Sequence, residues 1–86
     1  MIIRYTKKFQ REYKKLSLEI QKKAEAKESL FRKNPFSPTL KTHKLKGELD
    51  DMWAFSVDYV NRIVFEFNDD NGIAFFYSIG DHDIYK

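Results

Sequence analysis

The sequence contains no cysteine. This absence excludes a disulfide framework, a thiolate zinc site and a cysteine nucleophile. No apolar run approaches the roughly 20 residues that a membrane-spanning helix needs, and the N-terminal stretch MIIRYTKKF lacks the apolar region of a signal peptide. Gly-rich phosphate loops, serine nucleophile elbows, zinc motifs and helix-turn-helix signatures are also missing. We therefore expect a cytoplasmic protein that holds no metal ion and no cofactor.

What is present is enough for one small folded unit. The 86 residues leave no room for a second domain, so residues 1–86 are expected to form a single domain. Hydrophobic residues make up 42% of the chain and aromatic residues 16%. This composition predicts a compact core in which phenylalanine and tyrosine do much of the packing.

Charge is distributed unevenly between the two halves of the chain. Residues 1–46 hold fourteen Lys and Arg against four Glu, a net charge of +10, whereas residues 47–86 hold two basic and nine acidic residues, a net charge of −7. A basic segment of this density favours a polyanionic partner such as RNA or DNA. The alternative is a lysine-coated helical surface whose function is solubility.

The first half of the chain is predicted to be mainly helical. The β-branched residues within 1–5 favour a short strand, and Thr6 then provides an N-cap for a helix. Phe9, Tyr13 and Leu16 follow at spacings of four and three residues, which places them on one face of that helix.

Ser17 offers a second N-cap, so we expect two helices that meet near residues 16–17 and form a helical hairpin. One long helix remains an alternative, because neither glycine nor proline marks the joint. Asn34-Pro35 ends the helical region. The inward-facing candidates of the second helix are Ile20, Ala24, Leu30 and Phe31.

The second half of the chain has the period-two pattern of strands. Alternating apolar positions run through residues 52–59, 61–68 and 72–80, and Asn71-Gly72 is a strong hairpin turn. Residues 40–47 are a less certain strand. The predicted fold is therefore α+β: an N-terminal strand, a helical hairpin and then an antiparallel β-meander whose bulky face packs on the helices. That face is expected to carry Trp53, Phe55, Val57, Tyr59, Ile63, Phe65, Phe67, Ile73, Phe75, Tyr77 and Ile79.

Arg62 is the only arginine in the acidic half of the chain. Its position in the alternation places it opposite Ile63, on the face away from the helices. A guanidinium group held on a sheet offers a rigid fork for a phosphate. An ordinary salt bridge with Asp58, across the turn, is the alternative.

The sequence ends with an unusual group of side chains, GDHDIYK. His82 can donate or accept a proton near neutral pH, and the adjacent Asp81 and Asp83 favour its charged form. Tyr85 could bond a phosphate or stack on a base, or it could simply anchor the final strand. A solvated tail is the other interpretation of His82. A metal site shared with His43 has no support from ligand spacing.

A basic cluster surrounds His43: Lys41 precedes it, and Lys44 and Lys46 follow it. Strand alternation would place Lys41, His43 and Leu45 on one face and the other two lysines on the opposite face. The cluster is typical of a phosphate-contacting edge. A charged edge strand that prevents aggregation is an equally good interpretation.

These segments, taken together, resemble the RelE/ParE superfamily of bacterial type II toxins. The order of elements is similar over nearly the whole chain. The specific part is three short motifs in order: H-x-L-x-G (His43, Leu45, Gly47), the strand R-I-V-F (Arg62–Phe65) and the ending G-x-H…Y (Gly80, His82, Tyr85).

The resemblance implies a ribosome-dependent, metal-independent mRNA endoribonuclease of the RelE-like or YafQ-like type, in which a 2′-hydroxyl attacks the adjacent phosphate. It implies that Arg62 holds the phosphate, that His82 acts as general acid or base, and that Tyr85 orients the substrate or assists proton transfer. The implied RNA-binding residues are Lys41, His43, Lys44 and Lys46. The implied partners are a cognate antitoxin protein, the ribosome and mRNA.

Two other functions are alternatives to the nuclease. ParE-like members of the superfamily inhibit DNA gyrase and need no catalytic residues. A degenerate member would retain only antitoxin binding. The combination of arginine, histidine and tyrosine favours the nuclease.

Overall fold

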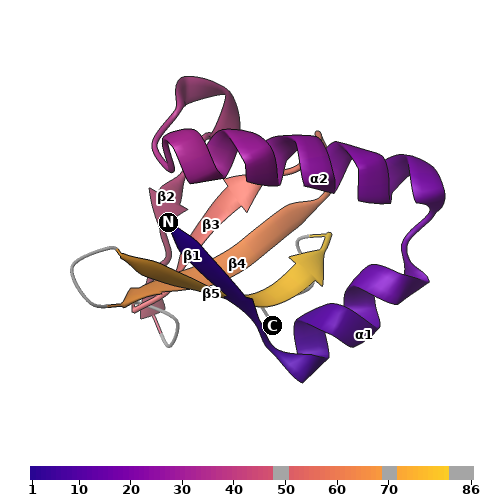
Figure 1. Ribbon diagram of the computed structural model, residues 1–86, viewed down its shortest axis with the longest axis horizontal. Coiled ribbons are helices and arrows are strands. Elements are labelled where there is room, and N and C mark those ends of the chain that lie inside the picture. Colours follow the sequence, from indigo (N-terminus) through magenta and orange to yellow (C-terminus); the bar gives the residue numbers. More distant parts are fainter. Residues whose placement is uncertain (48–50, 69–71, 82–86) are drawn as a thin grey trace.

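The computed structural model describes residues 1–47, 51–68 and 72–81, and Figure 1 shows their arrangement. The two α-helices are α1 (Lys7–Lys15) and α2 (Leu18–Lys33), and η1 (Pro38–Leu40) is a short 3₁₀ helix. The strands are β1 (Ile2–Tyr5), β2 (His43–Lys44), β3 (Trp53–Ser56), β4 (Arg62–Asn68) and β5 (Ile73–Gly80). In this part of the chain no helix is long and apolar enough to cross a membrane.

The strands form one mixed sheet in the order β1-β5-β4-β3-β2. β1 runs parallel to β5, and all other pairs are antiparallel. The predicted α+β class is confirmed, with its N-terminal strand, helical hairpin and antiparallel meander. The meander places the end of β3, the start of β4 and the end of β5 side by side, because Arg62 pairs with both Ser56 and Gly80.

Side-chain caps separate the two helices. The Thr6 hydroxyl accepts a hydrogen bond from the Phe9 amide (3.0 Å), and the Ser17 hydroxyl accepts one from the Ile20 amide (3.2 Å). Between them the backbone of Leu16 is extended, with φ −75° and ψ 153°. The predicted hairpin is therefore confirmed, and its joint comes from N-capping rather than from glycine or proline.

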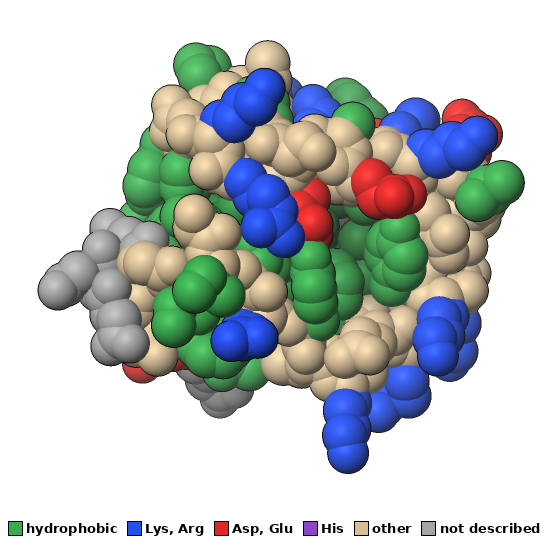
Figure 2. Space-filling model, in the orientation of Figure 1, with side chains coloured by type: hydrophobic (Ala, Val, Ile, Leu, Met, Phe, Trp, Pro, Cys, Tyr) green, Lys and Arg blue, Asp and Glu red, His purple; other side chains and the backbone are tan. Residues whose placement is uncertain are grey.

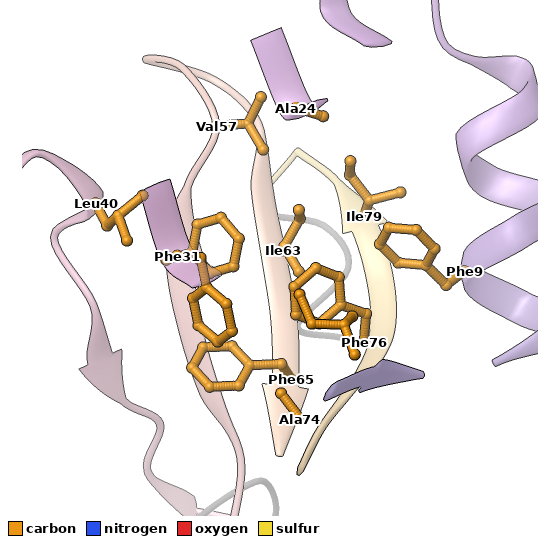
Figure 3. Close-up of a cluster of buried hydrophobic side chains, with 12 residues drawn as sticks. Phe9, Ala24, Phe31, Leu40, Val57, Ile63, Phe65, Ala74, Phe76 and Ile79 are labelled. Atoms are coloured by element: carbon orange, nitrogen blue, oxygen red, sulfur yellow. The ribbon is translucent and has the colours of Figure 1, made fainter. Parts of the chain in front are cut away.

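Phe31 is the centre of the core (Figure 3). This α2 residue is fully buried, and its ring lies 4.9 Å from the rings of Phe55 on β3 and Phe65 on β4 and 5.4 Å from Phe76 on β5. Phe9 of α1 packs against the same Phe76 ring at 5.6 Å. One aromatic cluster thus joins both helices to three strands, and ring pairs of this kind are favourable beyond their buried area.

A register shift in β5 changes which of its side chains reach this core. Phe65 pairs with Phe76, but the preceding Val64 pairs with Ser78, so Tyr77 is an extra residue on the β5 side. The prediction of which β5 residues face the core was wrong on the N-terminal side of this shift, for Ile73, Phe75 and Tyr77. It was correct on the C-terminal side, for Ile79. Ala74, Phe76 and Ile79 are buried in the core, whereas Ile73, Phe75 and Tyr77 are only half-buried.

Tyr59 was also predicted to face the helices, and this was wrong. β3 ends at Ser56, and the amide of Val57 already bonds across the turn to the Asn61 carbonyl at 2.9 Å. Val57 is buried, but Tyr59 is 95% exposed. Strand alternation does not continue into a turn, so the side chain of Tyr59 projects into solvent.

Candidate phosphate-binding site

Arg62 begins β4 on the face opposite the aromatic core. Its cross-strand partners are Ser56 and Gly80, whereas the next residue, Ile63, is buried among the core side chains. The predicted strand face of Arg62, opposite that of Ile63, is therefore confirmed. The side chain itself is half-buried at the end of the sheet.

The guanidinium group of Arg62 is held by main-chain oxygens. Its Nη1 donates to the carbonyls of Asp58 (3.0 Å), Asn61 (3.2 Å) and Tyr59 (3.3 Å). The alternative of a salt bridge to the Asp58 carboxylate was wrong, since no ion pair between described residues involves Arg62. Neutral carbonyls orient the planar fork without cancelling its charge, which leaves that charge to act on an anion.

The Asp58 carboxylate binds the backbone of the turn rather than Arg62. Its Oδ1 accepts hydrogen bonds from the amides of Asn61 (2.7 Å) and Val60 (2.9 Å), and Lys23 Nζ lies 3.8 Å from Oδ2. Burial alone would raise the pKa of Asp58, but these hydrogen bonds and the Lys23 charge outweigh burial and lower the pKa. The charged carboxylate therefore fixes the β3–β4 turn, and with it the three carbonyls that hold Arg62.

A hollow of about 390 Å³ lies beside Arg62, at the end of the sheet. Among the described residues, three cationic side chains line this hollow: Lys27 of α2, Lys41, which follows η1, and Arg62 of β4. The remaining lining residues are Thr39, Ser56, Val57, Asp58 and Tyr59. Three cations with hydroxyl groups beside them are a combination suited to a phosphate group.

Lys41 and His43 do not share a strand face as predicted. Lys41 follows η1 with a left-handed backbone (φ 53°), and β2 begins only at His43, so strand alternation does not apply to Lys41. Lys41 lines the hollow beside Arg62 because of this turn. His43 is exposed, with its Nδ1 3.1 Å from the Lys41 carbonyl oxygen, and it pairs with Ala54 of β3.

Lys44 and Lys46 are exposed and are not part of the hollow. Lys44 pairs with Trp53, whose ring packs against the core on the helix side of the sheet. The predicted RNA-binding cluster is therefore spread over two faces, and only Lys41 of the four residues lies in the hollow with Arg62.

His82 and Tyr85, the other two predicted catalytic residues, lie outside the described residues. The strand that precedes them does have a defined place, since β5 ends at Gly80 and Gly80 pairs with Arg62. Their roles stay predictions.

Sequence reasoning missed Lys27, Thr39 and Tyr59. α2 carries lysines at four positions, and nothing in the spacing of Lys27 distinguishes it from Lys22 or Lys23. Only the packing of α2 over the end of the sheet places Lys27 beside Arg62. The exposure of Tyr59 could have been predicted if the end of the strand before the turn had been placed correctly.

A second hollow, between α1, α2 and β1, has the opposite character. Figure 2 shows it as a depression lined by hydrophobic side chains with acidic side chains at its rim. Its apolar lining includes Tyr5, Phe9 and Tyr13, and its carboxylates are Glu25 and Glu28. The Tyr5 hydroxyl donates to Glu28 at 2.8 Å, and burial together with this carboxylate raises the pKa of Tyr5. Lys14 also lines this hollow, but two carboxylates accompany it among mainly aromatic groups. The described lining therefore suits a phosphate less well than the hollow at Arg62 does.

Comparison with known proteins relates this geometry to solved structures. No protein-family model matches the sequence, and no curated protein matches it. A YoeB/ParE toxin from Agrobacterium tumefaciens superposes with a TM-score of 0.81 at 16% identity, covering 95% of this chain and 99% of the other. The chain has the RelE/ParE toxin fold. The resemblance inferred from the three motifs is thereby confirmed for the fold.

Two further structures with this fold support the same conclusion. YafQ from E. coli strain BL21(DE3) gives a TM-score of 0.75 at 19% identity over 96% of this chain and 94% of the other. The RelE–RelB complex from Pyrococcus horikoshii OT3 contains a chain with a TM-score of 0.76 at 12% identity, covering 93% of this chain and 92% of that one. At such identities the RelE/ParE likeness concerns the fold, and function has to be argued from the site.

Proposed function

We propose that this chain is the toxin of a type II toxin–antitoxin pair and that it inhibits translation by cleaving mRNA on the ribosome. The observation that carries the proposal is the cationic hollow beside Arg62, on a chain with the RelE/ParE toxin fold. A gyrase inhibitor or a pure antitoxin binder has no need for an arginine oriented in this way.

The reaction begins with attack of a ribose 2′-hydroxyl on the adjacent phosphorus, and the 5′-oxygen of the next nucleotide leaves. Negative charge accumulates on the phosphoryl oxygens in the transition state. Arg62, already oriented by three carbonyls, stabilises that charge without reorganisation. Lys27 and Lys41, which line the same hollow, add positive charge.

Proton transfer needs a base for the 2′-hydroxyl and an acid for the leaving oxygen. We assign one of these steps to His82, and we assign substrate orientation or the second proton transfer to Tyr85. Both residues follow Gly80, the residue that pairs with Arg62, which supports their use at the same phosphate.

An antitoxin partner is proposed on the same basis. One of the structures that share the fold is described as a RelE–RelB complex. We propose that a neighbouring gene encodes an antitoxin and that co-expression of the two proteins relieves toxicity and allows co-purification. Toxicity that persists in the presence of a bound neighbour would contradict this assignment.

The nuclease is tested by single-turnover cleavage of mRNA on programmed ribosomes. Arg62→Ala is expected to lower the rate by about a hundredfold or more, and Arg62→Lys is expected to recover only part, since an ammonium cannot replace a planar fork. Arg11→Ala, which removes an exposed arginine from α1, is the matched control. Circular dichroism establishes that each variant is folded.

The terminal residues are tested in the same assay. His82→Ala should cost about 10²–10⁴ in rate, and His82→Gln should remain slow because an amide cannot transfer the proton. Tyr85→Phe should cost as much only if the phenol transfers a proton. Parental rates for both Arg62→Ala and His82→Ala would refute the proposed site, and inhibition of gyrase supercoiling would then identify the ParE-like alternative.

A further inference from the structure

We propose that the hollow beside Arg62 is a nucleotide subsite in which the phosphate lies on Lys27, Lys41 and Arg62 and the base stacks on Tyr59. This assignment rests on the proposed function, because it takes single-stranded RNA as the substrate. It adds base stacking on Tyr59 and binding of the ground-state phosphate by Lys27, neither of which the motifs or the fold likeness indicates.

Tyr59 has the exposure that base stacking requires. Its side chain is 95% exposed, compared with 51% for Phe36 and 39% for Tyr5. Those two rings pack on others, Phe36 on Trp53 and Tyr5 on Phe9, whereas none of the ring pairs between described residues includes Tyr59. A free aromatic face beside a cationic groove is the combination by which proteins hold single-stranded nucleic acid.

The backbone of Tyr59 is nevertheless held in place. Its carbonyl accepts a hydrogen bond from Arg62 Nη1 at 3.3 Å, and the residues on both sides are joined by the bond from the Val60 amide to the Asp58 carboxylate at 2.9 Å. A base that stacks on this ring therefore orders one side chain rather than a whole loop, which lowers the entropic cost of binding.

The same turn makes Tyr59 a lining residue of the hollow that holds the cations. Tyr59 lines the hollow together with Lys27, Lys41 and Arg62. The volume of about 390 Å³ is in the range of small-ligand sites. Among the described residues that line the hollow, Asp58 is the only one with a carboxylate, and its charge is already engaged by two backbone amides and by Lys23. The hollow therefore retains a net attraction for a phosphate.

Ribosome-free binding to two RNA probes separates base stacking from phosphate contact. One probe is a single-stranded oligouridylate of about six nucleotides, within the usual site size, and the other is the same backbone without bases. Tyr59→Ala is expected to weaken binding of the first probe by about five- to a hundredfold and to leave the second unchanged. Tyr59→Phe, which keeps the ring, should bind both probes as the parent does.

Val60→Ala is the matched control for Tyr59, because Val60 is the next residue, is 57% exposed and does not line the hollow. It should leave both affinities unchanged. If Tyr59→Ala weakens neither probe, or weakens both equally, the stacking role is refuted.

Lys27 is tested by the salt dependence of binding. Lys27→Ala should weaken both probes and reduce the slope of log K against log salt concentration by about 0.7, the loss of one phosphate contact on a single strand. Lys22→Ala, which removes an exposed lysine of the same helix outside the hollow, is the control and should not change the slope. Equal slopes for parent and Lys27→Ala would refute the phosphate contact.

Failure of the subsite and failure of the proposed function are distinguishable. If Tyr59→Ala and Lys27→Ala bind RNA as the parent does while Arg62→Ala loses cleavage, the subsite is wrong and the nuclease assignment stands. If Arg62→Ala cleaves mRNA at the parental rate while Tyr59→Ala has lost affinity for the base-bearing probe only, the subsite stands and the nuclease assignment fails.

Discussion

Replacement of Asp58 tests how the turn positions Arg62. Asp58→Ala removes the carboxylate that accepts hydrogen bonds from the backbone amides of Asn61 (2.7 Å) and Val60 (2.9 Å). It also removes the ion-pair partner of Lys23. It leaves the Asp58 carbonyl that bonds Arg62 in the chain, but it releases the turn that aims this carbonyl. We therefore expect a loss of stability and a separate loss of activity.

The size of the stability loss follows from the hydrogen bonds. A hydrogen bond to a charged group contributes about 1.5–3 kcal/mol, and contributions from one carboxylate are not additive. The Asp58 side chain is 21% exposed, so water can replace part of the lost hydrogen bonding. We therefore expect the free energy of unfolding to fall by about 2 kcal/mol. With a urea dependence of about 1 kcal/mol per molar for a small domain, the urea midpoint should fall by about 2 M.

The activity loss should exceed what unfolding explains. A domain with about 5 kcal/mol of stability retains about 3 kcal/mol after the substitution and stays more than about 99% folded. Displacement of the Arg62 fork by about 1 Å can nevertheless cost about a hundredfold in rate. We expect mRNA cleavage by folded Asp58→Ala to fall at least about tenfold.

The assay combines urea unfolding, followed by Trp53 fluorescence, with ribosomal cleavage. Asp58→Asn keeps an acceptor oxygen without the charge and should give intermediate stability. Asp51→Ala, which removes an exposed carboxylate before β3, serves as the control. A parental urea midpoint together with a parental cleavage rate for Asp58→Ala would show that this carboxylate does not position Arg62.

Three further predictions concern the fold. Phe31→Ala, which empties the centre of the aromatic core, should cost about 3–5 kcal/mol in urea unfolding, and a loss below about 1 kcal/mol would contradict the core described above. Ser17→Ala should cost about 1 kcal/mol by removing the N-cap of α2, and unchanged helicity and urea midpoint would argue against this cap. Hydrogen bonds outweigh burial and lower the folded pKa of both Glu12 and Asp58 from ordinary values of 4.5 and 3.8. Stability from these groups is therefore fully present above about pH 4.5 and is lost as the pH falls through the lowered values. A urea midpoint that does not decline between about pH 5 and pH 2 would contradict this sign.

Local chemistry in the sequence determined the elements of this protein. Ser17 placed the helical joint without glycine or proline, because an N-cap needs only one side-chain oxygen and the amides that follow it. Alternation through residues 61–68 oriented Arg62 away from the core, because successive side chains of a strand point to opposite faces. The three short motifs were enough to indicate the RelE/ParE fold.

Tertiary structure decided which residues gather around Arg62. The register shift at Tyr77 could not be predicted from alternation, since the strand carries apolar residues on both faces and only pairing with β4 selects Phe76 for the core. Lys27 is one of several similar lysines on α2, and only the packing of that helix places it in the hollow.

The same distinction applies to the β3–β4 turn. Alternation predicted that Tyr59 faces the core, because the apolar pattern in the sequence continues to residue 59. The strand ends earlier, at a turn in which the Asp58 carboxylate accepts hydrogen bonds from the amides of Val60 and Asn61. Tyr59 lies in this turn and is exposed. Periodicity reports the face of a residue within an element, whereas a site made of several elements depends on long-range contacts that no local pattern contains.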